Sequence, residues 1–168
     1  MNYSKIYTSR FNNESWEENE EYREKHKDVG CIYGCPQQLH RRIGLNNTIF
    51  VVEMNNSKNK IEGIGLIKNN LSVDKYHKVY KCGNYNRYIY KGKYRVSREI
   101  IERNNERLVE VLDYILFKEK THMKRGSGIT IISAKILKHE CCKSIDLQKE
   151  IEELFKRYYS IDKMDKEI

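Results

Sequence analysis

The segment 48–68 reads TIFVVEMNNSKNKIEGIGLIK and contains the strongest strand signal in the chain. Residues 48–54 form an apolar, β-branched run without glycine or proline, which predicts a strand. Residues 55–59 (NNSKN) have the composition of a turn, and residues 61–67 (IEGIGLI) predict a second strand. We therefore expect an antiparallel hairpin over 48–68.

The segments on both sides of this hairpin predict further strands and helices. Apolar periodicity and capping signals indicate helices at 14–26, 97–118 and 146–159, the first with Asn13 as its N-cap. Strand-like runs are found at 5–8, 85–90, 93–97 and 129–137. Lys91 and Gly92 separate two of these runs as either a turn or a kink, and the sequence leaves both interpretations open.

The order of these elements predicts an α+β fold in one domain spanning residues 1–168. A chain of 168 residues is long enough to bury one core. Gly63 and Gly65 lie two residues apart and so on one face of their strand, a pattern typical of a tightly curved sheet. We expect a curved, mostly antiparallel sheet flanked by helices, the last of them at 146–159.

Composition bounds the cellular setting. No run approaches 18 apolar residues, so we expect no membrane-spanning segment. The first 16 residues lack the apolar core of a signal peptide, which favours an intracellular protein in the cytoplasm or nucleus. Lys, Asn, Ile and Tyr make up 68 of the 168 residues, a bias that suits an AT-rich genome and leaves a virus-encoded protein as one interpretation.

Positive charge is concentrated in the segment 75–98, KYHKVYKCGNYNRYIYKGKYRVSR. It carries eight Lys or Arg, six Tyr and no acidic residue, and its charge of +8 equals the formal net charge of the whole chain. Cationic side chains attract a phosphate backbone and aromatic rings stack on bases, so this pattern is typical of binding to RNA or DNA. The alternative is an exposed sheet edge kept soluble by lysines, with tyrosines as half-buried strand formers.

Backbone contacts are expected from the basic residues of this segment and of one loop. The loop 124–128 (KRGSG) has two glycines that allow its N–H groups to form an anion-binding nest. The candidate phosphate-binding residues are Lys81, Arg87, Lys91, Lys93, Arg95 and Arg98, with Lys124 and Arg125 extending the same surface.

Catalytic and metal-binding signals are weak. The sequence contains no GxGxxG, Walker, HExxH or GxSxG motif, and we expect its five histidines to lie at the surface. A Cys-His nucleophile is not selected by any spacing. Five cysteines in a reducing compartment predict free thiols, and the adjacent Cys141 and Cys142 disfavour a tetrahedral zinc site. We therefore expect no catalytic residue, no cofactor and no metal.

The hairpin and the segments before it resemble a known family. IFVVEMNNSKNKIEGIGLIKN (49–69), preceded by KIYTS (5–9), a polar helix and GCIYGCPQQL (30–39), is similar to the YTH and EVE domains of the PUA-like superfold. The resemblance implies a pseudo-barrel that holds an unpaired or flipped, modified base in an aromatic cage while a basic surface grips the flanking backbone. Tyr33 then stands where such domains carry their first cage residue.

The remaining pocket candidates are Trp16, Asn55, Tyr88 and Tyr90. Trp16 is either a cage wall or a core anchor, and Asn55 either reads a base edge or serves the turn. The further tryptophans of a methyladenosine cage are absent, which favours another modified base or plain backbone binding. Two other classes stay open: an interaction protein that meets an acidic partner, and a nucleic-acid-processing enzyme similar to the related ASCH domains.

Overall fold

The chain folds into seven strands and five helices, as seen in a computed structural model that describes residues 5–118, 120 and 122–159. The strands are β1 (Ile6–Phe11), β2 (Cys31–Cys35), β3 (Thr48–Asn55), β4 (Lys60–Lys68), β5 (Tyr88–Gly92), β6 (Tyr94–Ser97) and β7 (Ile129–Ile131). The helices are α1 (Asn13–Lys25), α2 (Arg98–Asn104), α3 (Glu106–Phe117), α4 (Ala134–Leu137) and α5 (Leu147–Tyr158), with short 3-10 turns η1 (Gly83–Asn86) and η2 (Glu140–Cys142).

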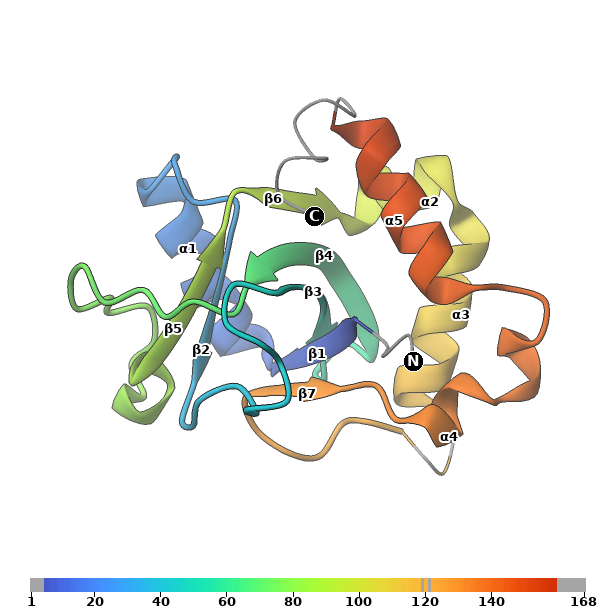
Figure 1. The fold of residues 1–168 in the computed structure, drawn as a ribbon, viewed down its shortest axis with the longest axis horizontal. Coiled ribbons are helices and arrows are strands. Elements are labelled where there is room, and N and C mark those ends of the chain that lie inside the picture. Colours follow the sequence, from blue (N-terminus) through green and yellow to red (C-terminus); the bar gives the residue numbers. More distant parts are fainter. Residues whose placement is uncertain (1–4, 119, 121, 160–168) are drawn as a thin grey trace.

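Two sheets cross each other at the centre of the molecule (Figure 1). The larger sheet has the order β6-β4-β3-β1-β7, and the smaller one pairs β2 with β5. The predicted hairpin is confirmed as β3–β4, paired antiparallel from Thr48↔Lys68 to Asn55↔Lys60. The predicted α+β class is confirmed as well. The larger sheet is mixed because β1 and β3 are parallel, and the described strands do not close into a barrel.

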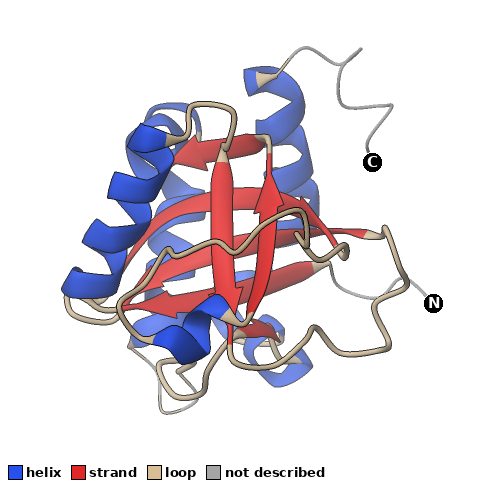
Figure 2. Ribbon diagram, turned by 90° about the vertical axis from the view of Figure 1, so that its left-hand side faces the viewer, coloured by secondary structure: helices blue, strands red, loops and turns tan. Residues whose placement is uncertain are grey.

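The larger sheet has a hydrophobic core on each face. Phe50, Val52 and Met54 of β3 pack toward the core that includes α2, α3 and α5. Ile49 and Val51, which alternate with them, pack toward β2, β5 and α1. Figure 2 shows this layering, with β2 and β5 crossing in front of the larger sheet and helices behind it. Among the described residues, no helix has both the length and the apolar character needed to cross a bilayer.

Gly92 marks a kink between β5 and β6, not a hairpin turn. β5 pairs with β2, whereas β6 pairs with β4, so the strand leaves the small sheet and enters the large one at this point. A Cβ atom at Gly92 would overlap the carbonyl oxygen of Leu66 in β4. The absence of a side chain therefore allows the two sheets to touch where the chain passes between them.

Local caps divide two of the predicted elements. The helix expected at 97–118 is two helices, because Asn105 ends α2 and its side chain accepts a hydrogen bond from the Leu108 N–H at the start of α3. The strand expected at 129–137 ends early, because Ser133 caps α4 in the same way. Asn12, not Asn13, is the N-cap of α1, where it forms a capping box with Ser15.

Gly63 and Gly65 leave the space in which the two sheets meet. A Cβ at Gly65 would overlap the Tyr33 hydroxyl and lie 2.8 Å from Cys31 Sγ. A Cβ at Gly63 would lie 2.8 Å from Arg95 Nη2 and 3.0 Å from Glu53 Oε2. These glycines therefore serve the close approach of β2 and of a polar cluster to β4.

We predict that Gly65→Ala lowers the free energy of unfolding by about 1–3 kcal/mol, because the added methyl group overpacks a fully buried contact. The matched control is Gly83→Ala, whose Cβ would have no neighbour within 4 Å. The control should stay within about 0.5 kcal/mol of the wild type in urea unfolding. Equal losses for the two variants would contradict this account of Gly65.

Candidate nucleic-acid interface

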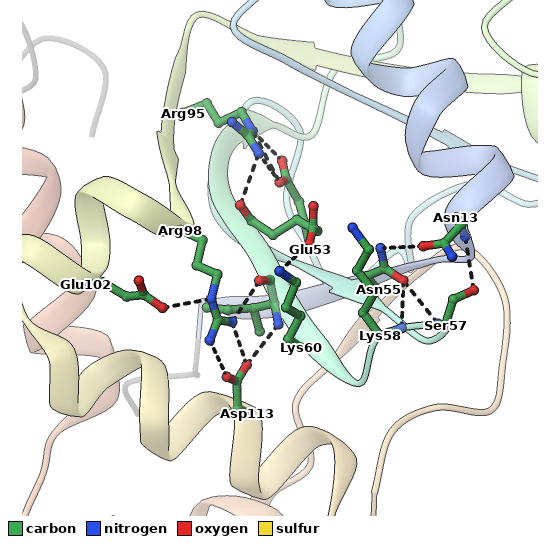
Figure 3. Close-up of polar contacts among 12 residues, drawn as sticks. Asn13, Glu53, Asn55, Ser57, Lys58, Lys60, Arg95, Arg98, Glu102 and Asp113 are labelled. Carbon is green, nitrogen blue, oxygen red and sulfur yellow. Dashed lines mark hydrogen bonds and ion pairs between the residues drawn. The ribbon is translucent and has the colours of Figure 1, made fainter.

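Arg95, one of the predicted phosphate-binding residues, lies inside the molecule. Its Nη2 is 2.7 Å from Glu53 Oε2 and its Nε is 2.9 Å from Glu53 Oε1 (Figure 3). The Tyr33 hydroxyl donates to Glu53 Oε1 at 2.8 Å. Burial alone would lower the pKa of Arg95, and the adjacent carboxylate of Glu53 more than reverses this, so the pKa is raised. Burial and the charge of Glu53 hold the pKa of Tyr33 well above its usual value.

Arg98 is also paired within the protein. Its guanidinium donates to both carboxylate oxygens of Asp113 (2.8 and 3.1 Å) and to the Ile61 carbonyl (3.0 Å). Glu102 completes the arrangement, with its Oε1 2.9 Å from Arg98 Nε (Figure 3). Arg98 thus ties α2 to α3 and β4. The expectation that Arg95 and Arg98 present free charge to a ligand is corrected, because both are occupied by carboxylates distant in sequence.

The predicted base pocket is not an open pocket. Tyr33 is fully buried, and Trp16 is 5% exposed, packed edge-on against Phe11 with Arg95 5.4 Å from its ring centre. Of the two interpretations that the sequence allowed for Trp16, a cage wall or a core anchor, the structure therefore favours the core anchor. The assignment of Tyr33 as an exposed cage wall is corrected, because the side chain lies between the two sheets.

The other pocket candidates have structural roles too. Tyr90 is 1% exposed, and its hydroxyl accepts a hydrogen bond from the Leu39 N–H at 3.0 Å. Asn55 is fully buried and shapes the β3–β4 turn, because its Oδ1 accepts from the N–H groups of Ser57 and Lys58 (Figure 3). Tyr88 is half-buried with the Arg87 guanidinium 5.7 Å from its ring centre.

The loop 124–128 accepts hydrogen bonds from the side chain of Arg10, a residue of β1. Gly126 and Gly128 have φ angles of 104° and 73°, as a nest would allow. Their carbonyl oxygens, however, accept hydrogen bonds from Arg10 Nε (3.1 Å) and Nη2 (3.0 Å). These two carbonyl oxygens therefore point to a guanidinium, and the anion nest, which would use the N–H groups of the loop, stays a prediction. Lys124 is half-buried and Arg125 is exposed beside it.

Three segments distant in sequence are joined on the side of the molecule that carries β2 and β5. The main chain of Asn69 bonds to Asn46 (3.1 Å) and Asn47 (2.9 Å), and its side chain donates to the Ile43 carbonyl (2.7 Å). The Ser72 N–H donates to the Ile89 carbonyl at 2.9 Å. These contacts place the loop 36–47 and the loop 69–82 beside β5, and both loops pack into the core shared with β2.

The segments joined in this way carry many basic side chains and very few acidic ones of their own. Residues 29–52 contain no acidic residue, and residues 63–98 contain only Asp74. We call the surface formed by the exposed cations of these segments the basic loop face, and it comprises Arg41, Arg42, Lys68, Lys75, Lys78, Lys81, Arg87 and Lys93. Half-buried Lys91 adjoins it, 3.6 Å from Asp74.

Most cations of the basic loop face have no acidic partner within the described part of the chain. Lys81 lies 3.6 Å from Glu14 of α1, and both side chains are largely exposed. Sequence reasoning missed Arg41, Arg42 and Lys68, because they lie outside the 75–98 segment. The signals that could have found them are the acid-free run 29–52 for Arg41 and Arg42, and the run 63–98 with its single acid, Asp74, for Lys68.

The loop 69–82 also exposes an aromatic ring. Tyr76 is 70% exposed, and Val73 and, on the neighbouring loop, Leu45 are 84% exposed. His77, the next residue, is buried, which corrects the expectation that every histidine lies at the surface. Its Nδ1 lies 2.7 Å from the Tyr22 hydroxyl and its Nε2 lies 3.3 Å from Asp74 Oδ1. The hydrogen bond from His77 lowers the pKa of Asp74.

Within the described residues, no three His, Cys, Asp or Glu side chains are grouped closely enough to hold a metal ion. What the basic loop face offers chemically is therefore positive charge, backbone groups at loop edges and the ring of Tyr76.

We predict that Glu53→Gln lowers the free energy of unfolding by about 3–5 kcal/mol, because it leaves the Arg95 guanidinium buried without its counter-charge. Glu62→Gln, on the neighbouring strand, is the matched control, since the ion pair of Glu62, with the half-buried Lys60, is longer at 3.9 Å and the Lys60 side chain is 39% exposed. The control should change the stability by less than about 1 kcal/mol. A loss no larger for Glu53→Gln than for Glu62→Gln, in urea unfolding at neutral pH, would contradict the buried pair.

No family model, curated protein or solved structure matches the chain. Its function is therefore inferred from the chemistry of the described residues.

Proposed function

We propose that the protein binds RNA or DNA through the basic loop face, with the cations contacting the phosphate backbone. The observation that carries this proposal is the meeting of two acid-poor segments, 29–52 and 63–98, on one side of the molecule. Exposed cations without acidic partners raise the local potential, and polyanions release counterions when they bind such a surface. The role proposed is binding, not catalysis, in an intracellular setting.

The acidic helix α1 limits where the backbone contacts lie. α1 contains six Glu, and Lys81 and the loop around His77 are attached to it. Phosphates are repelled near these carboxylates. We therefore place the strongest backbone contacts at Arg41, Arg42 and Lys68, which belong to the hydrogen-bonded loop pair around Asn69.

Tyr76 is the side chain best placed to stack on an unpaired base. Among the six tyrosines of the 75–98 segment, it is the one with a largely exposed ring, and Lys75 and Lys78 flank it. Stacking of a base on an aromatic side chain contributes about 1–3 kcal/mol per base and does not depend strongly on sequence. The proposed base contact thus moves from Tyr33 and Tyr90, which are buried, and the half-buried Tyr88 to an exposed ring.

We also propose that the fold is PUA-like. The support is the confirmed hairpin with its glycine-containing second strand, and the strand β5–β6 that passes from one sheet to the other at Gly92. We do not extend the proposal to reading of a modified base by a cage around Tyr33, because that side chain is enclosed between the sheets.

We predict that the triple variant Arg41→Ala, Arg42→Ala, Lys68→Ala weakens oligonucleotide binding and makes it less dependent on salt. The slope of log affinity against log salt should decrease in magnitude by about 2 between about 50 and 200 mM salt, since each lost phosphate contact contributes about 0.7–0.9. Fluorescence anisotropy with labelled single-stranded RNA, single-stranded DNA and duplex DNA measures this slope.

The matched control removes three exposed cations from α5, on the helix-covered side: Lys149→Ala, Lys156→Ala, Arg157→Ala. It carries the same change in net charge and should keep the wild-type slope. Absence of binding by the wild type to all three probes at low salt would overturn the proposal. Tighter binding to a polyglutamate peptide than to any oligonucleotide would instead identify an acidic protein as the partner.

We predict that Tyr76→Ala weakens binding of single-stranded probes at least about 5-fold and leaves duplex binding nearly unchanged, because a duplex offers no unstacked base. Tyr158→Ala on α5 is the control, since Tyr158 is also an exposed ring but lies on the helix-covered side. Equal effects of Tyr76→Ala on single strands and duplexes would show that the ring does not stack on bases.

A further inference from the structure

A cysteine and a histidine meet in the short turn between α4 and α5. Cys141 Sγ lies 3.0 Å from His139 Nδ1, a hydrogen-bonding distance. Cys141 is half-buried as a residue. A hollow of about 640 Å³ next to this turn is lined by residues 142–148 together with Ile6 and Leu137, and not by Cys141 or His139.

The main chain fixes the direction of the proton between the two side chains. The Cys141 N–H donates to His139 Nδ1 at 3.2 Å, so this ring nitrogen carries the lone pair. The Cys141 thiol can then only donate to Nδ1. This is the arrangement in which an imidazole takes the proton of a thiol and leaves a thiolate, the nucleophilic form of cysteine.

Cys142, the next residue, is buried and its thiol lies 3.9 Å from the Ile136 carbonyl oxygen. Burial, followed by the charge of Cys141 and a hydrogen bond with it, raises the pKa of Cys142 to about 11. Cys142 therefore stays a thiol near neutral pH. Of the two adjacent cysteines, Cys141 is the one with a histidine nitrogen at hydrogen-bonding distance.

The remaining cysteines lack this setting. Cys31 and Cys35 are buried, and burial raises the pKa of each to about 12, which keeps them as unreactive thiols. Cys82 is exposed, but no histidine is hydrogen-bonded to it in the described structure. Exposure alone would make Cys82 the most reactive thiol, whereas the histidine nitrogen 3.0 Å from the sulfur favours Cys141.

We propose that Cys141 is a nucleophilic thiol, activated by His139, that is oxidised by hydroperoxides. His139 Nδ1 takes the thiol proton and gives up the hydrogen bond that it accepts from the Cys141 N–H, and the thiolate attacks the terminal oxygen of the hydroperoxide. An S–O bond forms while the O–O bond breaks, and the leaving alkoxide takes the proton back from His139. The products are a sulfenic acid at Cys141 and an alcohol, so the sulfur is oxidised, the peroxide is reduced and His139 is regenerated.

The experiment compares two thiols in the same protein. At pH 7, iodoacetamide should alkylate Cys141 about 10-fold faster than Cys82. An ordinary thiol is only a few per cent ionised at this pH, so removal of the Cys141 proton by His139 accounts for the faster reaction. Peptide mass spectrometry over a time course gives both rates from one sample. Treatment with tert-butyl hydroperoxide and dimedone should label Cys141 in preference to Cys82.

His139→Asn tests the base without removing the cap. An asparagine oxygen can still accept the Cys141 N–H, as N-cap residues do, but it takes no proton from the thiol. The rate at Cys141 should fall at least 10-fold, to below that of Cys82, while the rate at Cys82 stays unchanged. Protection of the buried Cys31 and Cys35 from alkylation, together with circular dichroism, reports whether the variant is folded.

Two results would overturn the proposal: a wild-type Cys82 that reacts as fast as Cys141, or a Cys141 rate unaffected by His139→Asn. The wild-type comparison alone decides the matter if His139→Asn does not fold. Neither result depends on nucleic-acid binding, so this inference and the proposed function fail independently.

Discussion

The buried carboxylate of Glu53 is the constraint on which the arrangement of the two sheets depends. An unpaired charge between sheets is very costly, so the fold must bring a cation and a donor to it. Arg95 arrives from β6 and the Tyr33 hydroxyl from β2, while Gly63 and Gly65 leave room for them. One side chain of the central hairpin thereby fixes the positions of β2 and β6.

Signals that are local in sequence predicted the elements formed by local interactions. The hairpin 48–68 needs only its apolar runs and its turn, in which Asn55 accepts from the next N–H groups. The parallel pairing of β1 with β3 depends on contacts across more than forty residues, which periodicity does not encode. The break at Asn105 was missed because apolar periodicity continues through it, although the asparagine itself is a capping signal.

The candidate site was harder to predict, because the charge of a segment is not the charge of a surface. Residues 75–98 carry +8 as a sequence, but Arg95 and Arg98 are neutralised by Glu53 and Asp113, which lie elsewhere in the chain. Tyr90 is buried in the core as well, next to the buried Ile89. Conversely, Arg41, Arg42 and Lys68 join the surface only because Asn69 holds their loops together. Composition therefore indicated the part of the chain in which the basic surface lies, whereas tertiary contacts decide which of its cations are exposed.

The exposed position of Tyr76 has its own physical cause in the buried residue beside it. His77 is held between Tyr22 of α1 and Asp74 of its own loop, so the backbone at position 76 is fixed before any ligand arrives. A ring on a fixed loop loses less conformational entropy on stacking than a ring on a free one. Because His77 is buried and Tyr76 beside it is exposed, the contact that stabilises the loop also fixes the ring that the proposed binding uses. The proposed binding surface is therefore formed in advance at this loop, with its cations and its ring already in place.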